Sequence, residues 1–83
     1  MSIRIRVDSM RAAEEFSEIC KGFPNGLSLR SGQYRIDPKS TLGLLALMYS
    51  AKNEMYLDTG DLEDRQMPRF LQAIDAYTVK EGE

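Results

Sequence analysis

The sequence predicts an α+β open-faced β-sandwich, in which a four-stranded antiparallel sheet carries three helices on one face. Four short runs alternate apolar and polar residues, which is typical of half-buried strands. Three longer segments repeat apolar residues at helical spacing, and the resulting order is β-α-β-β-α-β-α. With 83 residues, the chain is long enough for one domain spanning residues 1–83 and too short for two.

The first strand and the first helix are predicted near the N-terminus. Residues 3–8 (IRIRVD) alternate apolar and charged side chains. A helical pattern begins at Ser9, where either Ser9 or Asp8 can act as the N-cap, and it ends at Gly22 and Pro24. The apolar stripe of this helix comprises Ala12, Ala13, Phe16, Ile19, Cys20 and Phe23.

A β-hairpin is predicted to follow. Residues 27–30 and 34–37 are short alternating runs, and residues 31–33 (SGQ) between them favour a tight turn. Asn25-Gly26 offers a turn before the hairpin in which a positive φ is available. Pro38 biases the residue before it toward an extended conformation, which ends the second strand of the hairpin.

The second half of the chain predicts a helix, a strand and a last helix. The helix runs from Ser40 to about Tyr49, and the strand covers residues 54–58. Because Pro68 has no backbone N–H, the last helix either begins near Asp64, with Pro68 in its first turn, or is kinked at Pro68. The apolar residues of the last helix are Met67, Phe70, Leu71, Ile74 and Tyr77.

Composition excludes several classes of function. The chain has no histidine, which excludes imidazole catalysis, histidine-ligated metals and phosphohistidine chemistry. Cys20 is the only cysteine, so an intramolecular disulfide is impossible and a cytoplasmic location is favoured. A net charge of -2 argues against a nucleic-acid or membrane surface, and no apolar run is long enough to span a bilayer. We expect no cofactor, no metal and no enzymatic activity, since no base, nucleophile and orienting group occur at a plausible spacing.

Three segments resemble the HPr phosphocarrier proteins of the bacterial phosphoenolpyruvate:sugar phosphotransferase system. They are RAAEEF (residues 11–16), KGF (residues 21–23) and KSTLG (residues 39–43), the last followed by further apolar residues. The spacing between these segments matches that of the family, and the expected order of elements is that of the family's fold. The resemblance therefore implies an HPr-like fold over most of the chain.

The phosphorylatable histidine of the family is missing. Family members carry it in a Gly-Leu-His-x-Arg-Pro-Ala loop before the first helix. Here Arg11 and Ala13 match that motif, Ala12 replaces the proline, and the loop is shorter. Ser9 would form a far less labile ester, with no base nearby to assist it. The resemblance thus implies a histidine-less, regulatory or adaptor member of the family that does not run the carrier cycle.

Ser40 is the candidate phosphorylation site, and Arg11 is the candidate anion-binding residue. Ser40 matches the serine that an ATP-dependent HPr kinase phosphorylates in many family members, and a helix N-terminus can stabilise a phosphate. The alternative is that Ser40 is only an N-cap. Arg11 matches the arginine that assists the phosphohistidine in the family. It can bind an anion at the helix start or form a surface ion pair with Glu15, of which we favour the pair.

The helix after Ser40 carries the expected docking surface. The residues that match the family's docking patch are Thr41, Leu42, Leu45 and Ala46. Leu42 and Leu45 can form an exposed apolar pair, whereas Leu44, Leu47 and Met48 are expected in the core. The alternative is that every leucine of this helix is core. Acidic residues near Arg11 count against docking to the usual phosphotransferase partners.

Three further features have simple structural interpretations. The acidic stretch at residues 58–64 suggests calcium, but it lacks EF-hand spacing and we favour a solvated turn. Cys20 lies on an apolar stripe and is expected to be a buried small hydrophobic residue. Tyr56 faces outward from its strand, where it could join a contact between subunits.

Two classes of function therefore compete. The first is an HPr-type regulator or adaptor that binds an HPr kinase-like enzyme or a transcriptional or metabolic regulator, with Ser40 as a switch. The second is an orphan interaction domain outside sugar transport, a homo-oligomer formed through the sheet, whose sign would be an exposed apolar patch near Tyr56. Nucleic-acid binding on the open sheet is disfavoured because the sequence has neither an RNP motif nor a basic platform.

Overall fold

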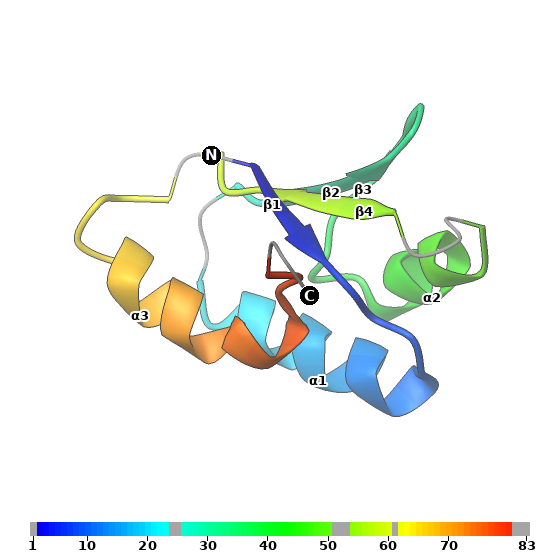
Figure 1. The fold of residues 1–83 in the computed structure, drawn as a ribbon, viewed down its shortest axis with the longest axis horizontal. Helices are drawn as coiled ribbons and strands as arrows, with labels where there is room; N and C mark the ends of the chain where they lie inside the picture. Colours follow the sequence, from blue (N-terminus) through cyan, green and yellow to red (C-terminus); the bar gives the residue numbers. More distant parts are fainter. Residues whose placement is uncertain (1, 24–25, 51–53, 61, 81–83) are drawn as a thin grey trace.

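The computed structural model describes residues 2–23, 26–50, 54–60 and 62–80. It confirms the α+β fold and the order β-α-β-β-α-β-α, with a short 3₁₀ helix added after the last helix. The sheet is antiparallel, and its strands lie in the order β1-β4-β2-β3. The three helices cover one face of this sheet and leave the other face open (Figure 1). The elements are β1 (Ser2–Ile5), α1 (Met10–Lys21), β2 (Ser28–Ser31), β3 (Tyr34–Ile36), α2 (Thr41–Ser50), β4 (Met55–Asp58), α3 (Met67–Ala73) and η1 (Asp75–Tyr77).

The core lies between the sheet and the helices. Alternate residues of the central strands point into it because successive side chains of a strand face opposite sides. The aromatic rings of Phe23 and Phe70 meet edge to face at 4.9 Å, and this contact joins the end of α1 to α3. The large core residues with no exposed surface are Phe16, Phe70, Ile5, Leu29, Leu44, Met55, Leu57, Ile74 and Val7.

Helix α1 forms as its apolar stripe predicts. The Ser9 hydroxyl oxygen accepts a hydrogen bond from the Ala12 N–H at 3.0 Å, so Ser9 is the N-cap and the alternative at Asp8 is wrong. Phe16 and Cys20 on the stripe are fully buried. Gly22 follows the last helical residue, as expected, whereas Pro24 and the predicted Asn25-Gly26 turn fall wholly or partly outside the described residues.

The first strand is shorter than predicted. β1 pairs with β4 only as far as Ile5, whereas the alternating pattern continues to residue 8. The end of β1 also bonds to the C-terminal segment: the Val79 N–H donates to the Arg4 carbonyl at 3.0 Å, and the Arg6 N–H donates to the Tyr77 carbonyl at 2.7 Å. These long-range bonds fix the C-terminal segment beside β1, and local periodicity cannot reveal them.

The turns differ slightly from the prediction. Ser31 and Tyr34 are paired, so the hairpin turn is the two-residue Gly32-Gln33 instead of residues 31–33. Gly32 has a φ of 59°, which such a turn requires. Gly60, after β4, also has a positive φ of 53°, and a Cβ there would collide with the backbone of Gly26.

The last helix follows the first of the two expected alternatives. α3 is unkinked in its interior because Pro68 occupies its first turn, where a missing N–H costs little. The helix begins at Met67, three residues after the expected start near Asp64. It ends at Ala73, so Ile74 and Tyr77 of the predicted stripe belong to the turn and the 3₁₀ helix that follow.

Candidate functional site

The N-terminus of α2 presents Ser40 to solvent. The Ser40 hydroxyl oxygen accepts a hydrogen bond from the Gly43 N–H at 3.2 Å, and its carbonyl accepts one from the Leu44 N–H at 3.0 Å. Ser40 is therefore the N-cap of α2, as predicted. It is also exposed, so the same hydroxyl that caps the helix is open to an approaching enzyme.

A small hydroxyl network anchors this helix start to α1. The Thr41 hydroxyl donates to the Ser17 hydroxyl at 3.2 Å, and the Ser17 hydroxyl donates to the Lys39 carbonyl at 3.0 Å. Ser17 is fully buried and Thr41 is half-buried. Thr41 was expected in an outward docking surface, but its hydroxyl contacts α1, which gives this side chain a structural role.

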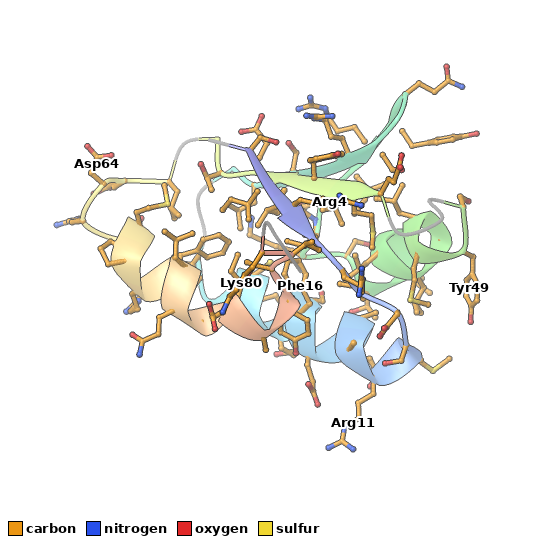
Figure 2. All side chains as sticks on the ribbon, viewed as in Figure 1. Arg4, Arg11, Phe16, Tyr49, Asp64 and Lys80 are labelled. Atoms are coloured by element: carbon orange, nitrogen blue, oxygen red, sulfur yellow. The ribbon has the colours of Figure 1, made fainter. Side chains whose placement is uncertain are left out.

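The outer side of α2 is apolar. Leu42 is 81% exposed and Tyr49 is 76% exposed, while Leu44 is fully buried on the opposite side. Ala46 is exposed as well, and positions 42, 46 and 49 lie on one face because they are separated by one helical turn. Figure 2 shows Tyr49 at the outer edge of the molecule.

We call Leu42, Leu45, Ala46 and Tyr49 the α2 patch. Leu45 is half-buried and packs against the core, so the expected fully exposed Leu42–Leu45 pair is only half correct. The alternative in which every leucine of the helix is core is wrong, since Leu42 is almost fully exposed. Tyr49 was not predicted as part of the docking surface, although its spacing of seven residues from Leu42 places both on one helix face.

Arg11 forms the predicted surface pair. Its guanidinium donates to the Glu15 carboxylate at 3.0 Å, and its side chain is 89% exposed. Glu15 also accepts a hydrogen bond from the Tyr77 hydroxyl at 3.0 Å. The hydrogen bonds from Tyr77 and then Arg11 hold the pKa of the Glu15 carboxyl below its usual value. In Figure 2 Arg11 points away from the sheet, whereas the bonded contact between α1 and the start of α2 runs through Ser17.

A pocket of about 460 Å³ opens beside the start of α1. Its two hydroxyl groups are already engaged: Tyr77 donates to Glu15, and Thr78 donates to the Asp75 carbonyl at 2.9 Å. No side chain in its lining combines a nucleophile with a base. The lining residues are Arg6, Asp8, Ala12, Ala76, Tyr77, Thr78 and Val79.

Cys20 and the acidic stretch have no reactive arrangement in the described part of the chain. Cys20 is fully buried, which confirms its expected packing role. Burial raises the pKa of its thiol to about 12, so the thiol stays protonated.

In the acidic stretch, the Asp58 carboxylate accepts a hydrogen bond from the Gly60 N–H at 3.0 Å, which closes a local turn. Within residues 2–23, 26–50, 54–60 and 62–80, no three histidine, cysteine, aspartate or glutamate side chains are grouped as metal ligands.

Comparison with known proteins supplies no family. No protein-family model, no curated protein and no solved structure matches this chain. Among the described segments, none of the helices has both the length and the apolar character needed to cross a bilayer.

Proposed function

We propose that this chain is a cytoplasmic regulatory or adaptor protein of the HPr type, which acts by binding a protein partner through the α2 patch. The resemblance of residues 11–16, 21–23 and 39–43 to the HPr family motivates the proposal. The observation that carries it is the position of the exposed Ser40 hydroxyl two residues before the exposed Leu42 side chain. A modifiable group therefore stands at the N-terminus of the helix that carries the apolar docking surface.

Ser40 serves as the switch in this proposal. A phosphate there would add close to two negative charges next to the N–H groups of the first turn of α2, where the helix dipole favours an anion. It would also place a strongly hydrated group at the end of α2 that carries Leu42. A partner that buries Leu42 would then have to desolvate the phosphate or offer it a cation, so phosphorylation selects between partners.

The absence of a carrier cycle is part of the same proposal. Phosphoryl transfer through this family's route needs an imidazole, and the chain has no histidine. Both hydroxyls of the pocket beside α1 already donate hydrogen bonds, and neither has a base at hand to activate it as a phosphoryl acceptor. We therefore propose a protein that receives a regulatory phosphate and transfers none.

The competing orphan domain has less support. That interpretation calls for an exposed apolar patch on the sheet near Tyr56. Tyr56 is half-buried, and the guanidinium of Arg30 lies over its ring. Among the described residues, the largest apolar exposure belongs to Leu42 and Tyr49 of α2.

Intact mass after two parallel incubations tests the proposal. One incubation contains ATP and an HPr kinase, and the other contains phosphoenolpyruvate and the general phosphotransferase enzyme. We expect one phosphate from ATP and none from phosphoenolpyruvate. The phosphate should disappear in Ser40→Ala and persist in Ser9→Ala, a matched control because Ser9 caps α1 in the way that Ser40 caps α2. Phosphate gained from phosphoenolpyruvate would refute the loss of the carrier cycle, and no phosphate in either incubation would favour the orphan domain.

A further inference from the structure

Three arginines and one tyrosine form a row across the open face of the sheet. The strand registers place Arg4 of β1 opposite Tyr56 of β4, Tyr56 opposite Arg30 of β2, and Arg30 opposite Arg35 of β3. Directly opposed residues of an antiparallel sheet share a face. We call Arg4, Tyr56, Arg30 and Arg35 the arginine row.

The arginine row points to solvent. Its strand neighbours Ile5, Leu29 and Leu57 are fully buried beneath the helices, and alternate residues of a strand face opposite sides. The side chains of the row must therefore lie on the face that no helix covers, which Figure 1 shows as the open side of the sheet. Given the usual separation of neighbouring strands, the row spans about 14 Å from β1 to β3.

No carboxylate neutralises the row within the described residues. Among the described residues, the salt bridges involve Arg11, Lys21, Arg65 and Lys80, all on other parts of the surface. Within the same part of the chain, the side-chain hydrogen bonds of the row go to neutral hydroxyls: Arg30 donates to Ser2 at 3.5 Å and Arg35 donates to Ser28 at 3.1 Å.

Acidic residues do flank the row without pairing with it. Asp58 sits on the same face between Ser2 and Ser28, but its carboxylate accepts from the Gly60 N–H. Glu54 precedes β4 and is exposed. Three further acids, Glu14, Glu15 and Glu18, lie on α1 on the opposite side of the sheet, where Glu15 pairs with Arg11 and Glu18 pairs with Lys21.

Two arginines of the row form an unfavourable like-charge pair. Arg30 and Arg35 are directly opposed, and like charges at such a position destabilise an antiparallel pair. Arg30 also lies over the Tyr56 ring at 4.8 Å, which orients its guanidinium without neutralising its charge. A polyanion laid along the row would neutralise all three guanidinium groups.

We propose that the arginine row binds the backbone of single-stranded nucleic acid. Guanidinium groups match phosphates in geometry and charge, and a base can stack on a guanidinium plane such as that of Arg30, which lies over the Tyr56 ring. This surface is separate from the α2 patch, so the inference does not depend on the proposed function. The low overall charge limits long-range attraction, and the expected binding is weak, with a dissociation constant of about 10⁻⁴ to 10⁻⁶ M at physiological salt.

Other occupants fit the row less well. A folded protein partner is usually anchored by large apolar or aromatic side chains. The exposed large apolar residues of the described chain are Met10, Tyr34, Leu42 and Tyr49, none of which belongs to the row. A second copy of the chain would bring arginines against arginines if the two rows met face to face, which like charges oppose.

Fluorescence anisotropy with a labelled single-stranded oligonucleotide of mixed sequence tests the proposal. The logarithm of the association constant should fall with the logarithm of salt concentration with a slope of about -2, since each of three phosphate contacts contributes about 0.7. Arg35→Gln should lower the affinity and reduce the slope to about -1.4. Tyr56→Leu should weaken binding by about 5-fold or more, because it removes the ring that orients the Arg30 guanidinium on which a base stacks.

Matched controls make the test specific to this surface. Arg65→Gln removes the same charge from an exposed side chain outside the sheet, and it should leave the affinity nearly unchanged. Arg35→Gln should retain or raise the melting temperature, because it removes a like-charge pair, so lost binding cannot be attributed to unfolding. Equal losses in Arg35→Gln and Arg65→Gln, or no binding at about 50 mM salt, would overturn the proposal. Tighter binding of a poly-glutamate peptide than of the oligonucleotide would overturn it in favour of an acidic protein partner.

Discussion

Two leucines of α2 provide the sharpest test of how this helix sits on the domain. Leu44 is fully buried and Leu42 is 81% exposed, although both are leucines of one helix separated by a single residue. We compare Leu44→Ala with Leu42→Ala. The chemical change is the same, so any difference in stability reports the environment of each side chain.

The expected difference is large. Leu44→Ala removes buried carbon groups worth about 2.4 kcal/mol in transfer free energy, at about 0.8 kcal/mol each. The cavity that remains adds to this loss, so the total should be about 3 to 4 kcal/mol. A domain of 83 residues has a total stability of about 4 to 12 kcal/mol, so Leu44→Ala should remove a major fraction of it. Leu42→Ala should change the free energy of unfolding by less than about 0.5 kcal/mol, because the side chain loses little buried area and alanine is a good helix former.

Urea unfolding followed by circular dichroism measures both variants. Leu44→Ala should also lower the melting temperature by more than about 10 °C, whereas Leu42→Ala should leave it within a few degrees. Equal destabilisation by the two substitutions would mean that α2 is rotated from the orientation described above. The α2 patch would then be part of the core, and the proposed docking surface would be refuted with it.

Three other predictions follow from single contacts. Gly60→Ala should destabilise the domain by more than Gly32→Ala in thermal unfolding, because both have positive φ but only the new Cβ at position 60 would strike opposing backbone. Cys20 should react with a thiol reagent far more slowly in the native protein than in denaturant, since burial raises the pKa of its thiol to about 12. In Tyr77→Phe, NMR titration should show the Glu15 pKa moving up toward its usual value. Because that pKa is lowered in the folded protein, the stability lost in the variant should be greatest near neutral pH and should shrink as acid protonates Glu15.

Local patterns sufficed for most of the fold. The N-cap of α2 could be predicted from sequence at Ser40, whereas the N-cap of α1 was narrowed only to Ser9 or Asp8; in the structure Ser9 and Ser40 accept the capping hydrogen bonds. The end of β1 could not be assigned. Its alternation continues past Ile5, where the pairing with β4 ends. The backbone around Ile5 also bonds to residues 77 and 79, which are more than seventy positions away in the sequence.

In the candidate sites, too, features set by local periodicity could be predicted and features set by long-range packing could not. Exposure of Leu42 follows from helical periodicity, but the half-burial of Leu45 depends on the way α2 packs on the rest of the domain. The arginine row could not be predicted from the sequence, because the net charge of -2 describes the whole chain and does not show where charges gather on the surface. Its members come from three strands, and only the pairing of β4 between β1 and β2 brings them together.

The two proposed surfaces lie on opposite sides of β3. Ile36 of this strand packs under α2, where its Cβ would lie 3.6 Å from a side chain at Gly43, and the adjacent Arg35 points to the open face. A partner docked on Leu42 therefore leaves the arginine row uncovered, and a nucleic acid on the row leaves Ser40 accessible. Leu42→Ala should consequently leave oligonucleotide affinity within about 2-fold of the parent protein, as expected for distant, independent sites. If Leu42→Ala weakened that binding as strongly as Arg35→Gln, a single surface would serve both functions and the separation argued from the sheet would be wrong.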